Sequence, residues 1–183
     1  QLNQDGVLDL VCVMANGYIQ TFIGMGDGTF DLLQTLQPAN WMNGAVAAAD
    51  FDADGNIDIV LVSSDGVVMV YNGAAGGILT SRAQIGTGKG ISDIAIGDFN
   101  GDGKPDFASA NTASNDITIF INLGGFAFNL LNSYVTGLTP YRLIAADLNG
   151  DQKTDLAVSN VDDLVVNIYT GAGDGSFSKS DLA

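Results

Sequence analysis

Histidine is absent from this chain of 183 residues, and cysteine occurs once, as Cys12. The absence of histidine removes the commonest general base and a common ligand of zinc and copper. A single cysteine cannot form an internal disulfide, so any fastening of loops must come from something else. Cys12 lies in the apolar run from Leu10 to Met14, where we expect a buried, unreactive thiol.

Long apolar runs are also missing, since no stretch approaches the about 18 consecutive apolar residues of a membrane span. We therefore expect no membrane insertion. The first residues, Gln1 to Asp9, lack the basic start and apolar centre of a secretory signal. They fall within a motif described below, so we expect a fragment of a longer protein from which any export signal was removed or omitted.

Basic residues are scarce: 6 Lys and Arg stand against 21 Asp and Glu, for a net charge of −15. Such a surface repels phosphate backbones and anionic lipids, which excludes nucleic-acid binding. The acidic residues are almost all Asp, clustered in expected loops rather than spread along a helix face. Clustered Asp side chains indicate binding of hard cations.

A nine-residue aspartate motif recurs along the chain. It reads DFDADGNID at 50–58, DFNGDGKPD at 98–106 and DLNGDQKTD at 147–155, with intervals of 48 and 49 residues. One further step back reaches QLNQDGVLD at 1–9, which keeps four of the motif's residues in register. The chain therefore contains four copies.

Apolar runs are arranged in the same way around each copy. A first run follows the motif at Leu10 to Met14, Ile59 to Val62, Phe107 to Ala110, and Leu156 to Val158. A second run follows a polar turn at Val67 to Tyr71, Ile117 to Ile121, and Leu164 to Tyr169. Small-residue stretches precede the last three copies at Ala45 to Ala49, Ile94 to Gly97, and Leu143 to Ala146. A glycine-rich connection then leads to a further strand, which makes four strands per repeat. The first repeat begins inside its loop, so we expect it to be one inner strand short.

This pattern predicts an all-β fold, a β-propeller of four-stranded antiparallel blades, with helix nearly absent. The predicted repeats are 1–43, 44–91, 92–140 and 141–183 within a single propeller domain or fragment. Stacking of blades buries both faces of each sheet, which explains the near-continuous apolar runs after the motif. Small residues suit the crowded strands nearest the propeller axis.

The motif has the ligand pattern of a calcium loop. Side chains at positions 1, 3, 5 and 9 supply oxygen, position 7 supplies a backbone carbonyl, and a glycine at position 6 allows a sharp turn. The candidate ligands are Asp50, Asp52, Asp54, Asn56 and Asp58; Asp98, Asn100, Asp102, Lys104 and Asp106; Asp147, Asn149, Asp151, Lys153 and Asp155; and Asn3, Asp5, Val7 and Asp9. Hard oxygen ligands favour Ca²⁺ over softer metals, and a flexible loop favours it over Mg²⁺.

Two alternatives explain parts of the motif. An EF-hand shares its first six positions, but position 12 is Leu61, Ser109 or Val158 instead of glutamate, and a strand follows instead of a helix. Simple β-turns explain any single copy but not the repeated distal Asp. The GDG triplets at 26–28 and 173–175 carry one Asp each and are predicted to be turns.

The four copies differ in quality. The 50–58 copy offers four carboxylates, and the 98–106 and 147–155 copies offer three each. Gln152 stands where glycine is expected, and a left-handed conformation there would cost on the order of 1 kcal/mol. Gln1 occupies position 1 of the first copy. We therefore predict three Ca²⁺ sites and a fourth, partial one.

DFNGDGKPD followed by a strand, with a later GxGDGxF, resembles the FG-GAP or VCBS repeat of integrin α-subunit β-propellers. The resemblance covers essentially the whole chain. It implies a calcium loop between the first two strands of each blade and an extracellular, secreted or cell-surface adhesion or ligand-binding module. Related propellers include lectins and accessory domains of secreted enzymes. Because such propellers commonly have seven blades, we expect a larger propeller, or another chain that completes this one.

The resemblance also places partner binding on the side opposite the calcium loops. That side would include Trp41, Asp65, Asn115, Tyr141 and Asp162, with Trp41 and Tyr141 as candidate ligand-binding residues. A structural role for Trp41 and Tyr141 at blade junctions remains an alternative. We expect a recognition module for a protein or glycan partner, with a lectin or a non-catalytic enzyme domain as the alternative. Catalysis is not expected, because there is no histidine, no GxSxG motif and no nucleophilic cysteine context.

Overall fold

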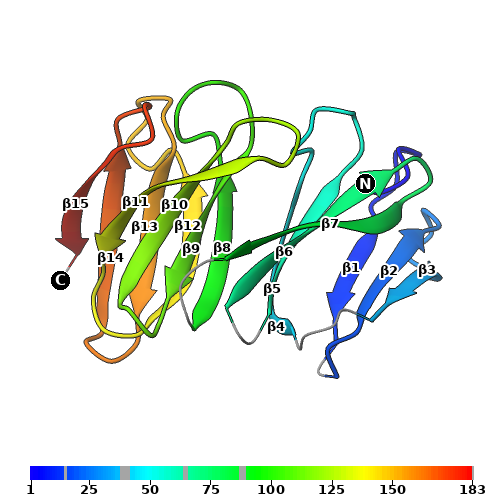
Figure 1. The fold of residues 1–183 in the computed structure, drawn as a ribbon, viewed down its shortest axis with the longest axis horizontal. Helices are drawn as coiled ribbons and strands as arrows, with labels where there is room; N and C mark the ends of the chain where they lie inside the picture. Colours follow the sequence, from blue (N-terminus) through cyan, green and yellow to red (C-terminus); the bar gives the residue numbers. More distant parts are fainter. Residues whose placement is uncertain (15, 38–41, 64–65, 87–89, 183) are drawn as a thin grey trace. The chain divides into compact units, whose positions relative to one another are not determined.

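The fold is all-β throughout the residues described by the computed structural model, which are 1–14, 16–37, 42–63, 66–86 and 90–182. Every regular element in these ranges is a strand, and the strands form four antiparallel sheets (Figure 1). The chain divides into two compact units, Gln1–Gly86 and Thr87–Ala183, each with two sheets. The described residues include no helix long and apolar enough to cross a membrane.

The complete sheet of the first unit contains four strands in sequential order. They are β4 (Met42–Ala49), β5 (Asp58–Ser63), β6 (Val67–Ala74) and β7 (Ile78–Gly86). Every residue of β5 is buried, as expected for a strand covered on both faces. The alternation of aspartate loop, strand, tight turn and strand therefore produces the predicted meander.

The other sheet of the first unit has three strands: β1 (Leu10–Val13), β2 (Ile19–Gly24) and β3 (Phe30–Leu36). Here the prediction of a strand covered on both faces is wrong. Leu10 of β1 is 42% exposed, whereas its counterpart Ile59 in β5 is fully buried. Cys12 is only partly buried as well. The reason is that β1 lies at a sheet edge, with no inner strand beside it among the described residues.

The second unit contains two complete four-stranded sheets. The first is formed by β8 (Ile91–Gly97), β9 (Asp106–Asn111), β10 (Asp116–Asn122) and β11 (Phe128–Val135). The second is formed by β12 (Pro140–Ala146), β13 (Asp155–Asn160), β14 (Val165–Gly171) and β15 (Phe177–Leu182). Leu164, predicted to start a strand, instead has φ 55° and is 89% exposed in the turn before β14.

Side chains join the two sheets of the second unit. At the inner strands, Ser92 Oγ donates to the carbonyl of Pro140 at 2.7 Å, and the Leu143 amide donates to Asp93 at 3.0 Å. Their shared core contains Ile117, Ile119, Leu143, Leu156 and Tyr169, all buried. Ala95 on the inner strand β8 belongs to this core, and Ala145 on the inner strand β12 packs against it, so small residues allow the two inner strands to approach closely.

Candidate metal centre

The four aspartate loops share one backbone conformation. Three of them connect β4 to β5, β8 to β9 and β12 to β13, and the fourth precedes β1. Position 4 has a positive φ in every copy, with values of 62° at Gln4, 61° at Ala53, 75° at Gly101 and 82° at Gly150. Position 6 also has a positive φ in every copy, with values of 90° at Gly6, 88° at Gly55, 80° at Gly103 and 67° at Gln152. Two left-handed residues separated by one other residue curl the chain around a common centre. The positive φ at position 4 was missed from the sequence, although Gly101 and Gly150 were a signal for it.

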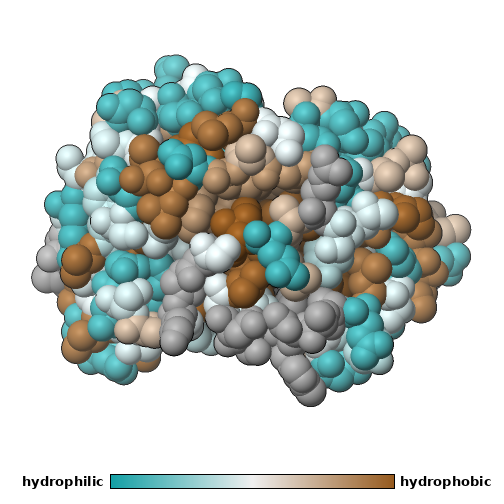
Figure 2. All heavy atoms as spheres, viewed as in Figure 1, coloured by the Kyte–Doolittle hydropathy of each residue, from teal (hydrophilic) through white to brown (hydrophobic). Residues whose placement is uncertain are grey.

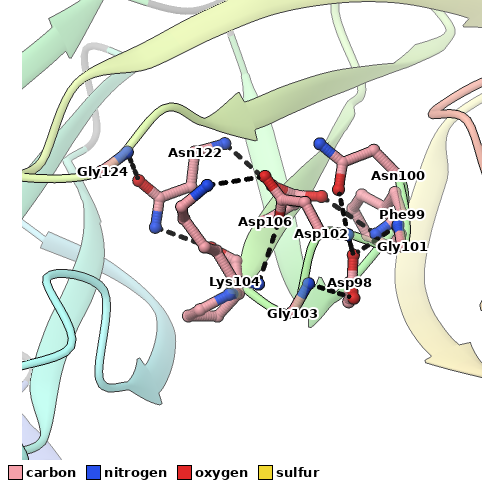
Figure 3. Close-up of polar contacts among 11 residues, drawn as sticks. Asp98, Phe99, Asn100, Gly101, Asp102, Gly103, Lys104, Asp106, Asn122 and Gly124 are labelled. Atoms are coloured by element: carbon pink, nitrogen blue, oxygen red, sulfur yellow. Dashed lines mark hydrogen bonds and ion pairs between the residues drawn. The ribbon is translucent and has the colours of Figure 1, made fainter.

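Side-chain oxygens within each loop hold this curl, as Figure 3 shows for the 98–106 loop. In the 98–106 loop, Asp98 accepts hydrogen bonds from the amides of Gly101 at 2.7 Å and Gly103 at 2.8 Å. Asn100 accepts from the Asp102 amide at 3.0 Å, and Asp102 accepts from the Lys104 amide at 3.0 Å. In the other loops, the side chains at positions 3 and 5 likewise accept hydrogen bonds from the amides two residues further on. The alternating Asp and Asn residues therefore shape the loop themselves.

Three carboxylates converge in the 50–58 loop. One oxygen each from Asp50, Asp52 and Asp58 lies within 4.8 Å of the others. Oxygens on opposite sides of a Ca²⁺ ion, each at about 2.3–2.6 Å from it, have a similar spacing. The donor set therefore fits a calcium ion, with Asp50, Asp52 and Asp58 as the residues that would hold it.

Electrostatics in this loop favours a cation. Burial raises the pKa of the Asp52 carboxyl, and the neighbouring charges of Asp54 and Asp50 add to the increase. Burial likewise raises the pKa of Asp58, although the amides of Gly73 and Phe51 oppose it. A raised pKa means that the negative form is disfavoured, and a divalent cation among these groups would relieve that cost.

The 98–106 loop carries its own cation near the candidate ligands. Lys104 Nζ donates to Asp102 Oδ2 at 2.8 Å, and this hydrogen bond is the main reason that the pKa of Asp102 is lowered. Both side chains are substantially exposed, so the pair contributes little free energy and can separate. Burial raises the pKa of Asp106 in the same loop.

The distal Asp of the motif has a second role that we did not predict. Its Oδ2 accepts a hydrogen bond from the backbone amide at position 2 of the motif. Its Oδ1 accepts a hydrogen bond from a backbone amide at the end of the third strand of the same blade. The Oδ2 donors are Leu2, Phe51 (2.7 Å), Phe99 (2.9 Å) and Leu148 (3.0 Å). The Oδ1 donors are Gly24 (3.0 Å), Gly73 (2.7 Å), Asn122 (2.8 Å) and Gly171 (2.8 Å). We call this pair of bonds the aspartate clamp, because it fixes each loop to the neighbouring strand end.

The first loop keeps the frame of the others but has fewer carboxylates. Asp5 accepts the Val7 amide at 2.7 Å, Asn3 accepts the Asp5 amide at 3.3 Å, and Asp9 forms the clamp. Position 1 is Gln1, whose side-chain oxygen carries no charge. Its metal site stays a prediction, as do the backbone carbonyl ligands of Val7, Asn56, Lys104 and Lys153.

Gln152→Gly is expected to increase the free energy of unfolding by about 0.5–1 kcal/mol. Gln152 has φ 67°, a conformation that costs an L residue about 1–2 kcal/mol, and the greater flexibility of unfolded glycine offsets part of the gain. Urea unfolding in EDTA measures the change. Gln20→Gly makes the same chemical change within strand β2 and is expected to lower stability. A lower unfolding free energy for Gln152→Gly would contradict this account.

The single aspartates of the GDG triplets make local turn contacts. Asp27 accepts the amide and hydroxyl of Thr29 at 2.9 and 2.6 Å, and Asp174 makes the same contacts with Ser176. These hydrogen bonds lower the pKa of both carboxyls. Each side chain thus serves its own turn, as expected for a turn residue.

The predicted partner side is described only in part, because Trp41 and Asp65 lie outside the described residues. In the second unit, Thr139 connects two of the predicted residues: its amide donates to Asn115 at 2.8 Å, and its hydroxyl donates to Asp162. Tyr141 is 49% exposed, and the Arg142 guanidinium lies 5.0 Å from its ring centre. A ligand role for Trp41 and Tyr141 stays a prediction.

Comparisons with known proteins agree with this architecture. The profile of the FG-GAP-like repeat family matches residues 1–61, 50–109 and 98–158. A solved structure titled as BBS1N in complex with ARL6DN, soaked with mercury, is similar over 98% of this chain, with a TM-score of 0.67 and 13% identity. The same complex soaked with lead has a TM-score of 0.63 and 14% identity over 97% of this chain. The chain covers 52% and 51% of those two chains, about half their length. No curated protein matches it in sequence.

Proposed function

The chain belongs to the FG-GAP-like repeat family, and from this premise we propose that it is a calcium-braced recognition module that binds a protein partner. In this proposal, Ca²⁺ ions rigidify the loops at one end of the blades. The opposite end, made of the tight turns and the connections between blades, contacts the partner. The module acts outside the cell or on its surface, without catalysis, and further blades or another chain complete the propeller.

The observation that carries the proposal is the convergence of Asp50, Asp52 and Asp58. Three carboxylates at this spacing repel one another unless a cation lies between them. The site is built from hard oxygen donors, which suits Ca²⁺. Extracellular fluids supply Ca²⁺ at concentrations that fill even weak protein sites of about 10⁻⁴–10⁻³ M affinity, which supports the proposed location.

A bracing role for the ions is supported by contacts between the 98–106 loop and the next sheet. Phe99 at position 2 is 1% exposed and packs edge to face with Phe177 at 5.6 Å. The Phe99 carbonyl accepts the Gly175 amide at 2.8 Å. An ion that holds the loop in shape would therefore also hold these contacts between β8–β11 and β12–β15.

A protein partner is supported by exposed apolar residues at the opposite end of the second unit. Leu138, Val161 and Leu164 are 53%, 47% and 89% exposed, and Tyr141 is half exposed. Two backbone bonds, from Val161 to Thr139 at 3.0 Å and from Asp162 to Leu138 at 3.4 Å, hold the two segments together. Exposed apolar side chains in a polar surround are typical of protein interfaces. The similar BBS1N structures also contain a protein partner.

Asp52→Ala is expected to lower the number of bound Ca²⁺ ions by one per chain. The hydrogen bond that the Asp52 side chain accepts from the Asp54 amide is long, at 3.2 Å, so removal of this side chain should leave the loop folded. Metal analysis after equilibrium dialysis gives the count. Asp27→Ala removes the same charge from a turn outside the motif and should leave the count unchanged. Equal counts for the unaltered protein and Asp52→Ala would exclude Asp52 as a ligand.

A further inference from the structure

Asparagine is followed by glycine at positions 3 and 4 of two aspartate loops, as Asn100–Gly101 and Asn149–Gly150. This dipeptide is chemically labile, because glycine has no side chain to hinder the attack of its amide nitrogen on the asparagine side chain. The 50–58 loop has an aspartate at position 3, Asp52. Asn100 and Asn149 therefore differ from their counterpart by one chemical step, the hydrolysis of a side-chain amide.

The 98–106 loop holds the Asn100 side chain against the Gly101 peptide (Figure 3). Asn100 Oδ1 accepts the Asp102 amide at 3.0 Å, so the side chain folds back along the chain toward Gly101. Gly101 is exposed, and the atom nearest to the point where a side chain would begin is the carbonyl oxygen of Gly173, at 3.4 Å. The two reacting groups are therefore neighbours in an open part of the loop.

The loop also reaches the water that hydrolysis requires. It joins β8 to β9 at the upper edge of the view in Figure 1, and Figure 2 shows hydrophilic residues along that edge of the second unit. Asn72–Gly73 in β6 is the opposite case. Gly73 is buried, its amide donates to Asp58 at 2.7 Å, and a side chain there would clash with the carbonyl oxygen of Ile57. The same dipeptide thus occurs once in an open loop and once in a fixed strand.

We propose that Asn100 and Asn149 are sites of spontaneous deamidation, which converts a loop with three carboxylates into a loop with four. The Gly101 amide nitrogen bonds to Asn100 Cγ and gives up its proton, the bond from Cγ to Nδ2 breaks, and ammonia leaves with that proton. Water then opens the cyclic imide. Cleavage between Cγ and the Gly101 nitrogen gives aspartate and restores the backbone. Cleavage between the backbone carbonyl carbon and that nitrogen gives isoaspartate, which lengthens the main chain by a methylene.

The aspartate product reproduces a loop that the fold already contains. In the 50–58 loop, Asp52 accepts the Asp54 amide at 3.2 Å, as Asn100 accepts the Asp102 amide. Asp52 is also one of the three carboxylates that meet in that loop. Deamidation would add a charged oxygen donor to the candidate metal centre, and Ca²⁺ affinity depends on the number of charged ligands. This consequence rests on the calcium binding proposed above, whereas the modification itself does not.

Peptide mapping by tandem mass spectrometry, after incubation of the whole chain in mildly alkaline buffer with EDTA, tests the modification. We expect deamidation of Asn100 and Asn149 to be at least about tenfold faster than that of Asn72, because reaction within a strand requires local unfolding. In urea, Asn72 should react as fast as Asn100. Equal rates at Asn72 and Asn100 in the folded chain would overturn the proposal. Slow reaction of Asn72 in urea would overturn its structural basis, since the fold would then not be what protects this residue.

A matched pair of variants tests the effect on calcium by titration calorimetry. Asn100→Asp places the product in the 98–106 loop, and we expect the Ca²⁺ dissociation constant of one site to fall on the order of tenfold. Asn16→Asp makes the same change in a turn outside the motif, where Asn16 accepts the Tyr18 amide at 3.2 Å, and should leave the constants unchanged. The same constants for Asn100→Asp and the unaltered protein would overturn the gain in affinity. Absence of Ca²⁺ binding in both would overturn the calcium proposal, while faster deamidation at Asn100 than at Asn72 would still support the modification.

Discussion

Calcium is expected to raise the melting temperature of the metal-free protein by about 5–10 °C for each loop that it fills. A ligand at 100 times its dissociation constant stabilises the folded state by about 2.7 kcal/mol. For chains of about this length, 1 kcal/mol corresponds to about 2–4 °C. Calorimetry or circular dichroism in EDTA, followed by excess Ca²⁺, measures the shift. The physical reason is that convergent, partly buried carboxylates destabilise the metal-free fold and become favourable when they bind the ion.

The identity of the cation is tested in the same experiment. Mg²⁺ at the same concentration should produce a much smaller shift, because it requires near-ideal octahedral geometry and loses its water reluctantly. Asp52→Ala should remove only the contribution of the 50–58 loop and leave the remaining shift. Identical melting curves in EDTA and in Ca²⁺ would mean that the loops hold their shape through their internal hydrogen bonds alone.

Much of the fold could be predicted because its determinants are local. The repeated Asp and Asn side chains bond to amides two residues further on, so the motif shapes its own loop wherever it occurs. The runs after it are apolar because they form the buried core, and β5 and β9 are buried at every position. Turn residues and apolar runs thus indicated the order of the strands without knowledge of distant contacts.

The features that could not be predicted depend on distant or missing neighbours. The apolar run of β1 resembles that of β5, yet β1 is only partly buried, because burial depends on the neighbouring strands as well as on the run itself. Leu148 at position 2 is 45% exposed, whereas Phe51 and Phe99 at the same position are 1% exposed. The same motif therefore gives different burial in different copies.

The distal Asp illustrates a different limit. Its position in the motif suggested a metal ligand, and in the 50–58 loop Asp58 does lie near Asp50 and Asp52. The sequence could not show that the same carboxylate accepts an amide from the end of the third strand, 15 or 16 residues further along in every copy. That contact requires the folded blade. The distal Asp is accordingly both a candidate ligand and a structural fastener.

Asp106→Ala is expected to lower the free energy of unfolding by about 2–5 kcal/mol even in EDTA. Asp106 is fully buried, and its carboxylate accepts the amides of Phe99 at 2.9 Å and Asn122 at 2.8 Å. Alanine leaves both donors buried without these acceptors, at about 1–3 kcal/mol each, and adds a small cavity. Asp106→Asn keeps one acceptor oxygen and removes a buried carboxylate charge, which burial disfavours because it raises the pKa of Asp106. Asp106→Asn should therefore lose less unfolding free energy than Asp106→Ala.

Asp102→Ala is the matched control, because Asp102 is an exposed candidate ligand outside the clamp. In EDTA its loss should stay within about 1 kcal/mol. Similar losses for Asp102→Ala and Asp106→Ala in EDTA would show that the aspartate clamp adds nothing to the metal-free fold.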